Sequence, residues 1–238
     1  MTVKAVLFDL GNTLVYQNPY KTFQKILGTH GIIRTTEEIE EAFAKTSREF
    51  DIERHSELSA HEFYTQLNIH ILKHLGITNS NSLQALAEDI DIQWFKASKI
   101  HVYHDAKPTL AKLKKMGLKL GLITDGYKND LEKILPKVGL QKFFDVCVCG
   151  DTVGKRKPNP QVFRYALNQL NVRASEAIFV GDRFYTDYLG AKKAGMTPIL
   201  IRRESNKQEV AGFRCVTSLK EVFKVLEAME GKGERFSP

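Results

Sequence analysis

The sequence predicts an α/β fold in which a Rossmann-like, doubly wound parallel sheet forms the core and an all-helical cap is inserted into it. Strand-like and helix-like segments alternate regularly from residue 105 onward. These strand-like segments are apolar nearly throughout, as is typical of parallel strands covered by helices on both faces. Residues 17–104, by contrast, show helix signals and almost no strand signal. We therefore predict a core domain of residues 1–16 and 105–238 and a cap domain of residues 17–104.

The elements of the predicted core follow one another in a simple order. The strand-like segments are AVLF (5–8), LKLGLIT (118–124), FDVCVCG (144–150), AIFVGD (177–182) and TPILIRR (197–203). The helix-like segments are PTLAKLKKM (108–116), YKNDLEKIL (127–135), PQVFRYALNQL (160–170), TDYLGAKKAG (186–195) and LKEVFKVLEAME (219–230). From the second strand to the fifth, one helix-like segment separates each pair of successive strands, which is the spacing of βαβ units.

The predicted cap contains three apolar-striped helices. They are EEIEEAFAKTSREF (37–50), HEFYTQLNIHILKHL (61–75) and SLQALAEDIDIQWF (82–95). Thr35 with Glu38, and Ser59 with Glu62, have the spacing of capping boxes and predict where the first two begin. The cap sequence itself indicates no substrate.

Composition narrows the class of protein. The 238 residues are 42% hydrophobic and 26% charged, as in an ordinary globular chain. The net charge of +7 is spread among mixed acidic and basic residues, so we predict a solvated basic surface and no nucleic-acid partner. No apolar run is long enough to cross a bilayer and the N-terminus lacks a leader pattern, so we expect a cytoplasmic protein without a membrane partner, as a monomer or homodimer. Three cysteines form no disulfide framework.

Polar residues of types that serve in catalysis or ligand binding lie at strand ends and helix starts. They are Asp9 after the first strand, Thr124, Asp125 and Gly126 after the second, Lys157 before a helix, and Asp182 with Asp187 after the strand AIFV. An acid in such a position often only caps a helix. In a parallel sheet, however, all of these ends meet at one edge, where ligands bind near the topological switch point.

The joint order of four motifs resembles a known family. FDLGNTL, LITDG, KRKPNP and VGDRFYTD look like the four successive motifs of the haloacid dehalogenase superfamily of phosphohydrolases. The helical insert between the first two motifs is similar to the family cap that closes over small substrates. The resemblance covers essentially the whole chain, and it implies an Mg²⁺-dependent phosphatase that acts on a small phosphorylated metabolite.

The resemblance implies a role for each site residue, and the chemistry agrees. Asp9 would attack phosphorus and form an aspartyl-phosphate. The metal ligands would be Asp9, the backbone carbonyl of Gly11 and Asp182, with Asp187 as an outer or weaker partner. Lys157 would neutralise the nucleophile and the phosphoryl group, and Thr124, with the amides of Asp125 and Gly126, would bind phosphate oxygens.

Several neighbouring residues have competing interpretations. Lys155 and Arg156 are expected to be solvated positive charges, because the pair Lys157 and Pro158 matches the family pattern. Asp125 is interpreted equally well as a turn former and as a catalytic group. Thr13 is expected to hold the nucleophile loop through its hydroxyl.

Gly11 departs from the pattern of most family phosphatases. They carry a second Asp there, which protonates the leaving group and activates water, while its carbonyl binds the metal. Gly11 keeps the carbonyl and lacks the carboxylate. Since loss of a general acid costs about 10²- to 10⁴-fold in rate, we expect slow turnover of alkyl esters and faster turnover of acyl, enol or aryl phosphates.

Two alternatives compete with the phosphatase. A 2-haloacid dehalogenase would use Asp9 without metal, but its D-x-Y-G-T pattern is absent, and the acids of GDRFYTD are retained. A non-catalytic module that binds a phosphometabolite would explain Gly11, yet it would have no need for Asp9, Lys157 and Asp182.

Overall fold

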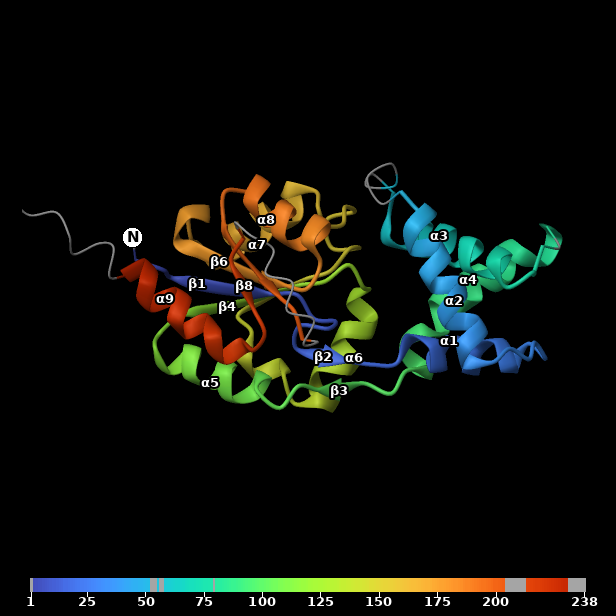
Figure 1. Cartoon of the computed structure of the whole chain (residues 1–238). Helices are drawn as coiled ribbons and strands as arrows, with labels where there is room; N and C mark the ends of the chain where they lie inside the picture. The colour runs from blue at the N-terminus through green and yellow to red at the C-terminus, as the bar shows by residue number, and fades with distance from the viewer. Residues whose placement is uncertain (1, 52–54, 56–57, 79, 204–212, 231–238) are drawn as a thin grey trace, which may run out of the picture. The chain divides into compact units, whose positions relative to one another are not determined.

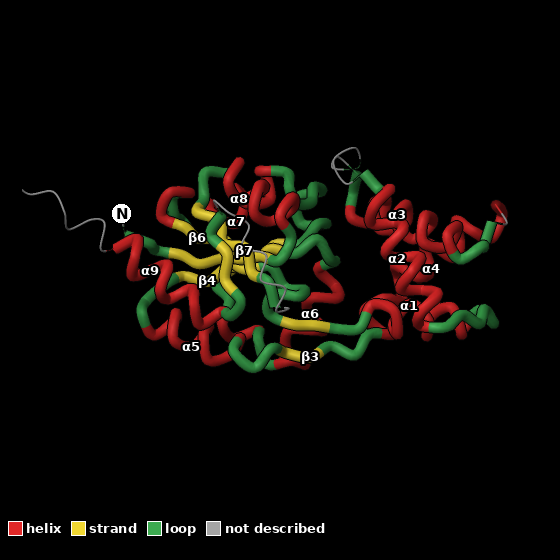
Figure 2. The backbone as a smooth tube through the Cα atoms, in the orientation of Figure 1, coloured by secondary structure: helices red, strands yellow, loops and turns green. Residues whose placement is uncertain are grey.

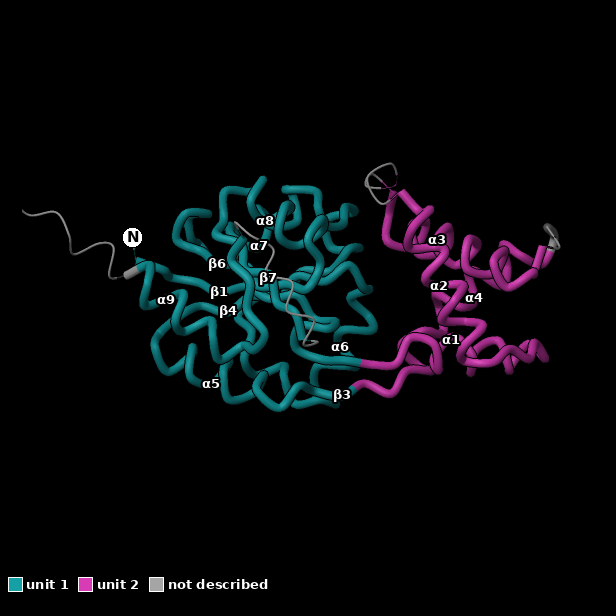
Figure 3. Tube along the Cα trace, in the orientation of Figure 1, with its two compact units in different colours: residues 1–16, 101–238 teal, residues 17–100 magenta. Residues whose placement is uncertain are grey.

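The chain folds into two compact units, which are described separately. The computed structural model describes residues 2–51, 55, 58–78, 80–203 and 213–230. One unit comprises residues 1–16 and 101–238, and the other comprises residues 17–100 (Figure 3). No helix among these described residues is both long and apolar enough to cross a membrane.

A six-stranded parallel sheet forms the centre of the first unit, in the order β5-β4-β1-β6-β7-β8 (Figures 1 and 2). The strands are β1 (Ala5–Phe8), β4 (Lys119–Ile123), β5 (Val146–Val148), β6 (Ala177–Gly181), β7 (Thr197–Ile201) and β8 (Cys215–Val216). From β1 the chain builds outward on one side through β4 and β5, then returns to the other side of β1 through β6, β7 and β8. The topological switch point therefore lies at β1, and the predicted doubly wound fold is confirmed.

Helices cover both faces of this sheet because every central strand is apolar on both sides. They are α5 (Ala106–Lys115), α6 (Lys128–Val138), α7 (Pro160–Leu170), α8 (Gly190–Lys193) and α9 (Val222–Glu230), with a π-helical turn at Phe184–Leu189. Figure 1 shows α7 and α8 on one side of the sheet and α5 and α9 on the other. Phe163 of α7 packs edge-on against Phe179 of β6, within a cluster that includes Leu7. Because alternate strand residues point to opposite faces, Val6 and Phe8 serve the other layer.

The second unit is a group of helices with its own core. Its helices are α1 (Pro19–Thr29), α2 (Thr36–Glu49), α3 (Ala60–His74) and α4 (Ser80–Ala97). Both predicted capping boxes form, since the Thr35 and Ser59 hydroxyls accept from the amides of Glu38 and Glu62, and each glutamate accepts in return. Phe23, Ile39, Leu72 and other apolar side chains fill the space between the helices.

A two-stranded ribbon within the first unit marks where the chain leaves and re-enters it. β2 (Val15–Tyr16) pairs antiparallel with β3 (His101–Val102). The boundaries of the compact units therefore fall at 16/17 and 100/101, whereas the sequence places the second boundary at 104/105. The short ribbon carries only two residues per strand, too few for a period-two pattern to be visible in the sequence.

Candidate active site

Asp9 lies at the centre of the carboxyl edge of the sheet. It follows β1, whose last residue, Phe8, pairs with Leu122 of β4 on one side and Val180 of β6 on the other. The Asp9 amide donates to the Val180 carbonyl at 2.9 Å, which continues the ladder and fixes the start of the turn. Only 8% of the residue is exposed. The apolar strand β1 thus places the buried Asp9 carboxylate at the switch point.

Lys157 is the cation that meets this carboxylate. Its ammonium donates to Oδ1 of Asp9 at 2.5 Å and to Oδ1 of Asp187 at 2.7 Å. Its backbone amide donates to Oδ1 of Asp125 at 2.8 Å, which fixes the loop before α7. Burial lowers the pKa of Lys157, but the charges of Asp187 and Asp9 outweigh it and raise that pKa well above its usual value. Lys157 therefore carries a permanent positive charge.

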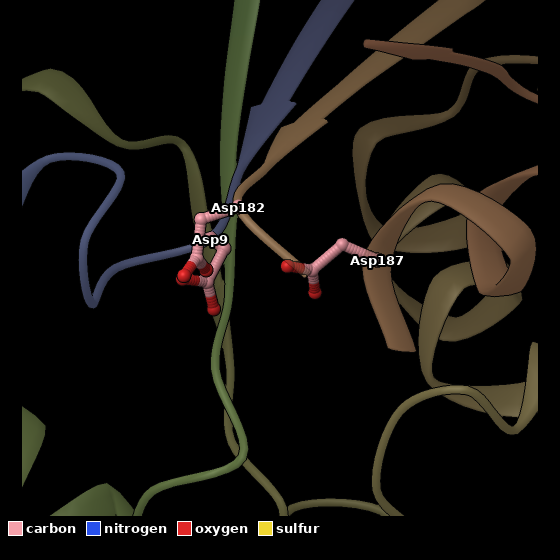
Figure 4. A group of neighbouring side chains, drawn as sticks. All are labelled: Asp9, Asp182 and Asp187. Atoms are coloured by element: carbon pink, nitrogen blue, oxygen red, sulfur yellow. The ribbon is translucent and has the colours of Figure 1, made fainter. Parts of the chain in front are cut away.

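Asp182 and Asp187 complete an acidic cluster around Asp9. Each of the three carboxylates offers an oxygen, and these atoms lie within 4.8 Å of one another. Figure 4 shows Asp187 directing its carboxylate from its helical turn toward Asp9 and Asp182, which follow neighbouring strands. Among the described residues, no other group of three or more His, Cys, Asp or Glu side chains is close enough to hold a metal.

Local backbone features bring Asp187 this close. Its Oδ2 accepts from the Arg183 amide at 2.9 Å, across a turn that is π-helical rather than α-helical. Single π-helical turns are rare and occur often at functional sites. Gly181 permits the approach, because a Cβ there would lie 2.5 Å from the Asp187 carboxylate. The sequence predicts a helix for residues 186–195 but gives no signal for the wider turn.

Negative charge exceeds positive charge in the cluster. Burial raises the pKa of Asp9 from 3.8 to about 7; the charge of Lys157 opposes this shift, and the charges of Asp187 and Asp182 add to it. Burial likewise raises the pKa of Asp182. Hard oxygen donors with surplus negative charge are what Mg²⁺ prefers. Asp9 and Asp182, with the charge of Asp187 beside them, therefore fit a divalent cation.

The loop after Asp9 is a tight turn with an open position at Gly11. The amides of Leu14 and Val15 both donate to the Leu10 carbonyl, at 2.9 and 3.0 Å. Asn12 adopts the left-handed conformation, with φ of 51°, and its amide group donates to Oδ2 of Asp182 at 3.4 Å. A Cβ at Gly11 would meet nothing within 4 Å. A longer side chain is therefore sterically tolerated where the sequence lacks the second acid.

The segment after β4 lies at the same edge of the sheet. Thr124 follows Ile123 directly, and its hydroxyl accepts from the Gly126 amide at 3.3 Å. The Asp125 carboxylate faces the backbone of Lys157, as described above. Of the two interpretations of Asp125, this contact gives its side chain a positioning role within the loop.

Comparison of the chain with models of known protein families shows its family. A family model described as haloacid dehalogenase-like hydrolase matches residues 6–201. The chain belongs to this family. The prediction of this family, made from the four motifs, is therefore confirmed for this haloacid dehalogenase-like hydrolase.

Relatives of this haloacid dehalogenase-like hydrolase include phosphatases and a dehalogenase. A glyceraldehyde 3-phosphate phosphatase of Methanopyrus kandleri is 31% identical over 84% of this chain and 84% of its own. The structure of a phosphatase of the same family from Thermococcus onnurineus is 28% identical, with a TM-score of 0.64, over 94% of this chain and 98% of that one. A 2-haloacid dehalogenase from Pseudomonas syringae is 25% identical, with a TM-score of 0.64, over 96% of this chain and 100% of that one.

Sequence reasoning missed a second buried ion pair near the nucleophile loop. Arg203 donates to both oxygens of Asp105, at 2.8 and 2.7 Å, and also to the carbonyl of Thr13. The Thr13 hydroxyl, expected to hold the loop, is buried without a hydrogen-bond partner. The loop is held through the Thr13 carbonyl instead. The only sequence signal is an acid before a helix, at Asp105, which suits an ordinary cap equally well.

Proposed function

We propose that this hydrolase is an Mg²⁺-dependent phosphatase that acts on a small phosphorylated metabolite through an aspartyl-phosphate on Asp9. The observation that carries the proposal is the buried Asp9 carboxylate, which touches the ammonium of Lys157 and stands beside two further acids. A carboxylate nucleophile needs a fixed cation to approach an anionic phosphate, and this cluster supplies one. The phosphatase names of its relatives support the same class of reaction.

The proposed reaction has two steps on the chain's own residues. An Asp9 oxygen forms a bond to phosphorus while the bond from phosphorus to the leaving oxygen breaks, and the leaving oxygen takes a proton from solvent. Water next attacks phosphorus and gives a proton to solvent, while the bond from phosphorus to Asp9 breaks and inorganic phosphate leaves. Lys157 holds Asp9 and neutralises the transferring group, and Thr124, with the amides of Asp125 and Gly126, binds phosphate oxygens.

The cation is proposed to bind to oxygen atoms of Asp9, Asp182 and the Gly11 carbonyl. When bound, it neutralises the charge shared by the nucleophile and the phosphate, so that the two anions can meet. Asp187 is assigned the outer role, because both of its oxygens already accept hydrogen bonds, from Lys157 and Arg183. It therefore orients Lys157 rather than binding the ion directly.

The absence of an acid at Gly11 selects the class of substrate. Acyl, enol and aryl phosphates expel stable anions, whereas an alkyl phosphate such as glyceraldehyde 3-phosphate expels an alkoxide that needs a proton. We therefore propose faster turnover of activated phosphates than of alkyl esters, by about 10²-fold. Equal rates on a sugar phosphate and an aryl phosphate, at the same Mg²⁺ concentration, would contradict this preference.

A phosphate-release screen tests the function. The panel would contain acyl, aryl and sugar phosphates, with glyceraldehyde 3-phosphate among them, assayed with Mg²⁺ and with EDTA. Release that requires Mg²⁺ and disappears in Asp9→Asn is the expected result. Chloride release from a 2-haloacid in EDTA would favour the dehalogenase instead. Binding of phosphometabolites without turnover in either protein would favour the non-catalytic module.

A further inference from the structure

Arg203 joins three parts of the core unit through one guanidinium group. The residue follows β7, and its side chain is 9% exposed. One nitrogen, Nη1, donates to both carboxylate oxygens of Asp105, and the other, Nη2, donates to the Thr13 carbonyl. The guanidinium carbon also lies 3.9 Å from the centre of the Tyr103 ring, so the group is stacked as well as bonded. Such a fork has little freedom to reorient.

Asp105 in turn fixes Arg203. Its side chain is fully buried, and Oδ2 also accepts from the Ser218 hydroxyl at 2.8 Å and the Leu219 amide at 2.9 Å. Despite burial, these hydrogen bonds and the charge of Arg203 lower the pKa of Asp105. The Asp105 carboxylate is therefore fixed by hydrogen bonds from Arg203, which follows β7, and from Ser218 and Leu219 at the start of the last helical segment.

The nucleophile loop is the segment that Arg203 and Asp105 hold in place. Thr13 lies two residues after Gly11, and its hydroxyl makes no hydrogen bond, so the backbone carbonyl is its polar attachment to Arg203. The next residue is tied to the ribbon, because the Tyr103 amide donates to the Leu14 carbonyl at 3.0 Å. Both ties reach the loop from segments that are distant in sequence. Arg203 stacks on Tyr103, so the two ties are mechanically linked.

We propose that Arg203 is a positioning residue for the reaction, which sets the orientation of the loop that carries the Gly11 carbonyl and Asn12. It acts through the Thr13 carbonyl and touches neither substrate nor the reacting atoms. The catalytic part of this inference rests on the proposed function, because it assigns the Gly11 carbonyl to the cation. The structural part, that Arg203 orders residues 11–14, stands independently of it.

Two variants of Arg203 test the inference. Arg203→Lys keeps the charge but cannot reproduce the fork, and Arg203→Gln removes the charge. The expected result is an increase of about tenfold in the Mg²⁺ concentration for half-maximal activity, as is typical when a residue that orients a metal ligand is lost. Arg203→Gln should show the larger change. Amide exchange of residues 11–14 in the metal-free protein should also become about tenfold faster, because the loop loses an anchor.

Two control variants separate positioning from general destabilisation. Arg173→Gln removes an exposed arginine, paired with Glu176 at 2.7 Å, and should leave both readouts unchanged. Leu170→Ala opens the core at a residue that is 3% exposed, and should lower stability without changing the half-maximal Mg²⁺ concentration. These two variants define what charge loss and stability loss do by themselves.

The outcomes distinguish this inference from the proposed function. Wild-type values in both Arg203 variants, for Mg²⁺ dependence and for loop exchange, would overturn it. A Leu170→Ala effect equal to that of Arg203→Gln would overturn it as well. If the wild-type protein releases no phosphate, the proposed function fails, and amide exchange alone still decides whether Arg203 orders the loop. If Arg203→Gln does not fold, the comparison of Arg203→Lys with the controls decides.

Discussion

Asp9 and Asp105 are buried carboxylates of the core unit that each touch a buried cation, and they differ in how their charge is balanced. Asp105 accepts from Arg203, Ser218 and Leu219, and these contacts lower its pKa. Asp9 accepts from Lys157, but burial, together with the charges of Asp187 and Asp182, raises its pKa to about 7.

The difference indicates which site is built for structure and which for binding. At Asp105 every donor comes from the protein, so the folded chain itself satisfies the charge. At Asp9, three carboxylates lie around one ammonium, so the protein's own hydrogen-bond donors leave negative charge that a bound cation would neutralise. Burial alone therefore does not distinguish the two carboxylates, whereas the surplus charge at the switch point supports the proposal that Asp9 is the functional one.

Substitution of the proposed nucleophile should have the largest effect on turnover. Asp9→Asn is expected to reduce turnover by at least about 10³-fold, or about 4 kcal/mol of barrier, because an amide cannot attack phosphorus. The free energy of unfolding without metal should be unchanged or higher, since one of three crowded charges is gone. Phosphate release and urea unfolding measure the two effects. A large loss of stability would mean that Asp9 is structural.

The matched substitution of Asp105, which pairs with Arg203, should instead lower stability. Asp105→Asn is expected to lower the free energy of unfolding by about 3 kcal/mol, because Arg203 would remain buried without its counter-charge. Urea unfolding at neutral pH measures it. A loss smaller than that of the exposed Arg173→Gln would show that the Asp105 pair does not stabilise the core.

Introduction of an acid at Gly11 tests whether the missing carboxylate limits turnover of alkyl phosphates. Gly11→Asp is expected to raise turnover of alkyl phosphates by about 10- to 100-fold, with little gain on acyl phosphates. The open space at Gly11 accepts the side chain. Steady-state rates on one substrate of each class measure the effect. Unchanged alkyl turnover would mean that another group already supplies the proton.

The smallest expected effect is the acid sensitivity of the Asp105 pair. Because its pKa in the folded chain is depressed below 3.8, the pair contributes full stability above about pH 5 and loses it as pH falls through the folded pKa. The difference in unfolding free energy between wild type and Asp105→Asn should therefore shrink in acid. Unfolding curves at several pH values check this, and a constant difference would contradict it.

The sequence predicts the parts of this molecule that depend on neighbouring residues. Apolar strands such as AIFV, capping boxes at Thr35 and Ser59, and the polar residues at strand ends are local patterns, and the structure contains them. The position of Asp9 beside Lys157 also follows, because parallel strands bring their carboxyl ends to one edge.

The remaining features depend on contacts between distant residues. Asp105 and Arg203 lie 98 residues apart, and nothing near either residue indicates the other. The contact of Asp187 with Lys157 depends on a π-helical turn and on Gly181, neither of which has a periodic signal. The strand β3, at His101–Val102, is too short to show a periodic signal.

Trapping of the phosphorylated protein tests the central claim, that Asp9 carries a phosphoryl group, most directly. The protein would be mixed with an aryl phosphate and Mg²⁺ and quenched in acid during turnover, and mass spectrometry would then examine the peptide that contains Asp9. The account predicts an added phosphoryl group on this peptide and none on the same peptide of Asp9→Asn. Phosphate release without any phosphoryl group on the Asp9 peptide would contradict the account, because water would then attack the substrate phosphorus directly.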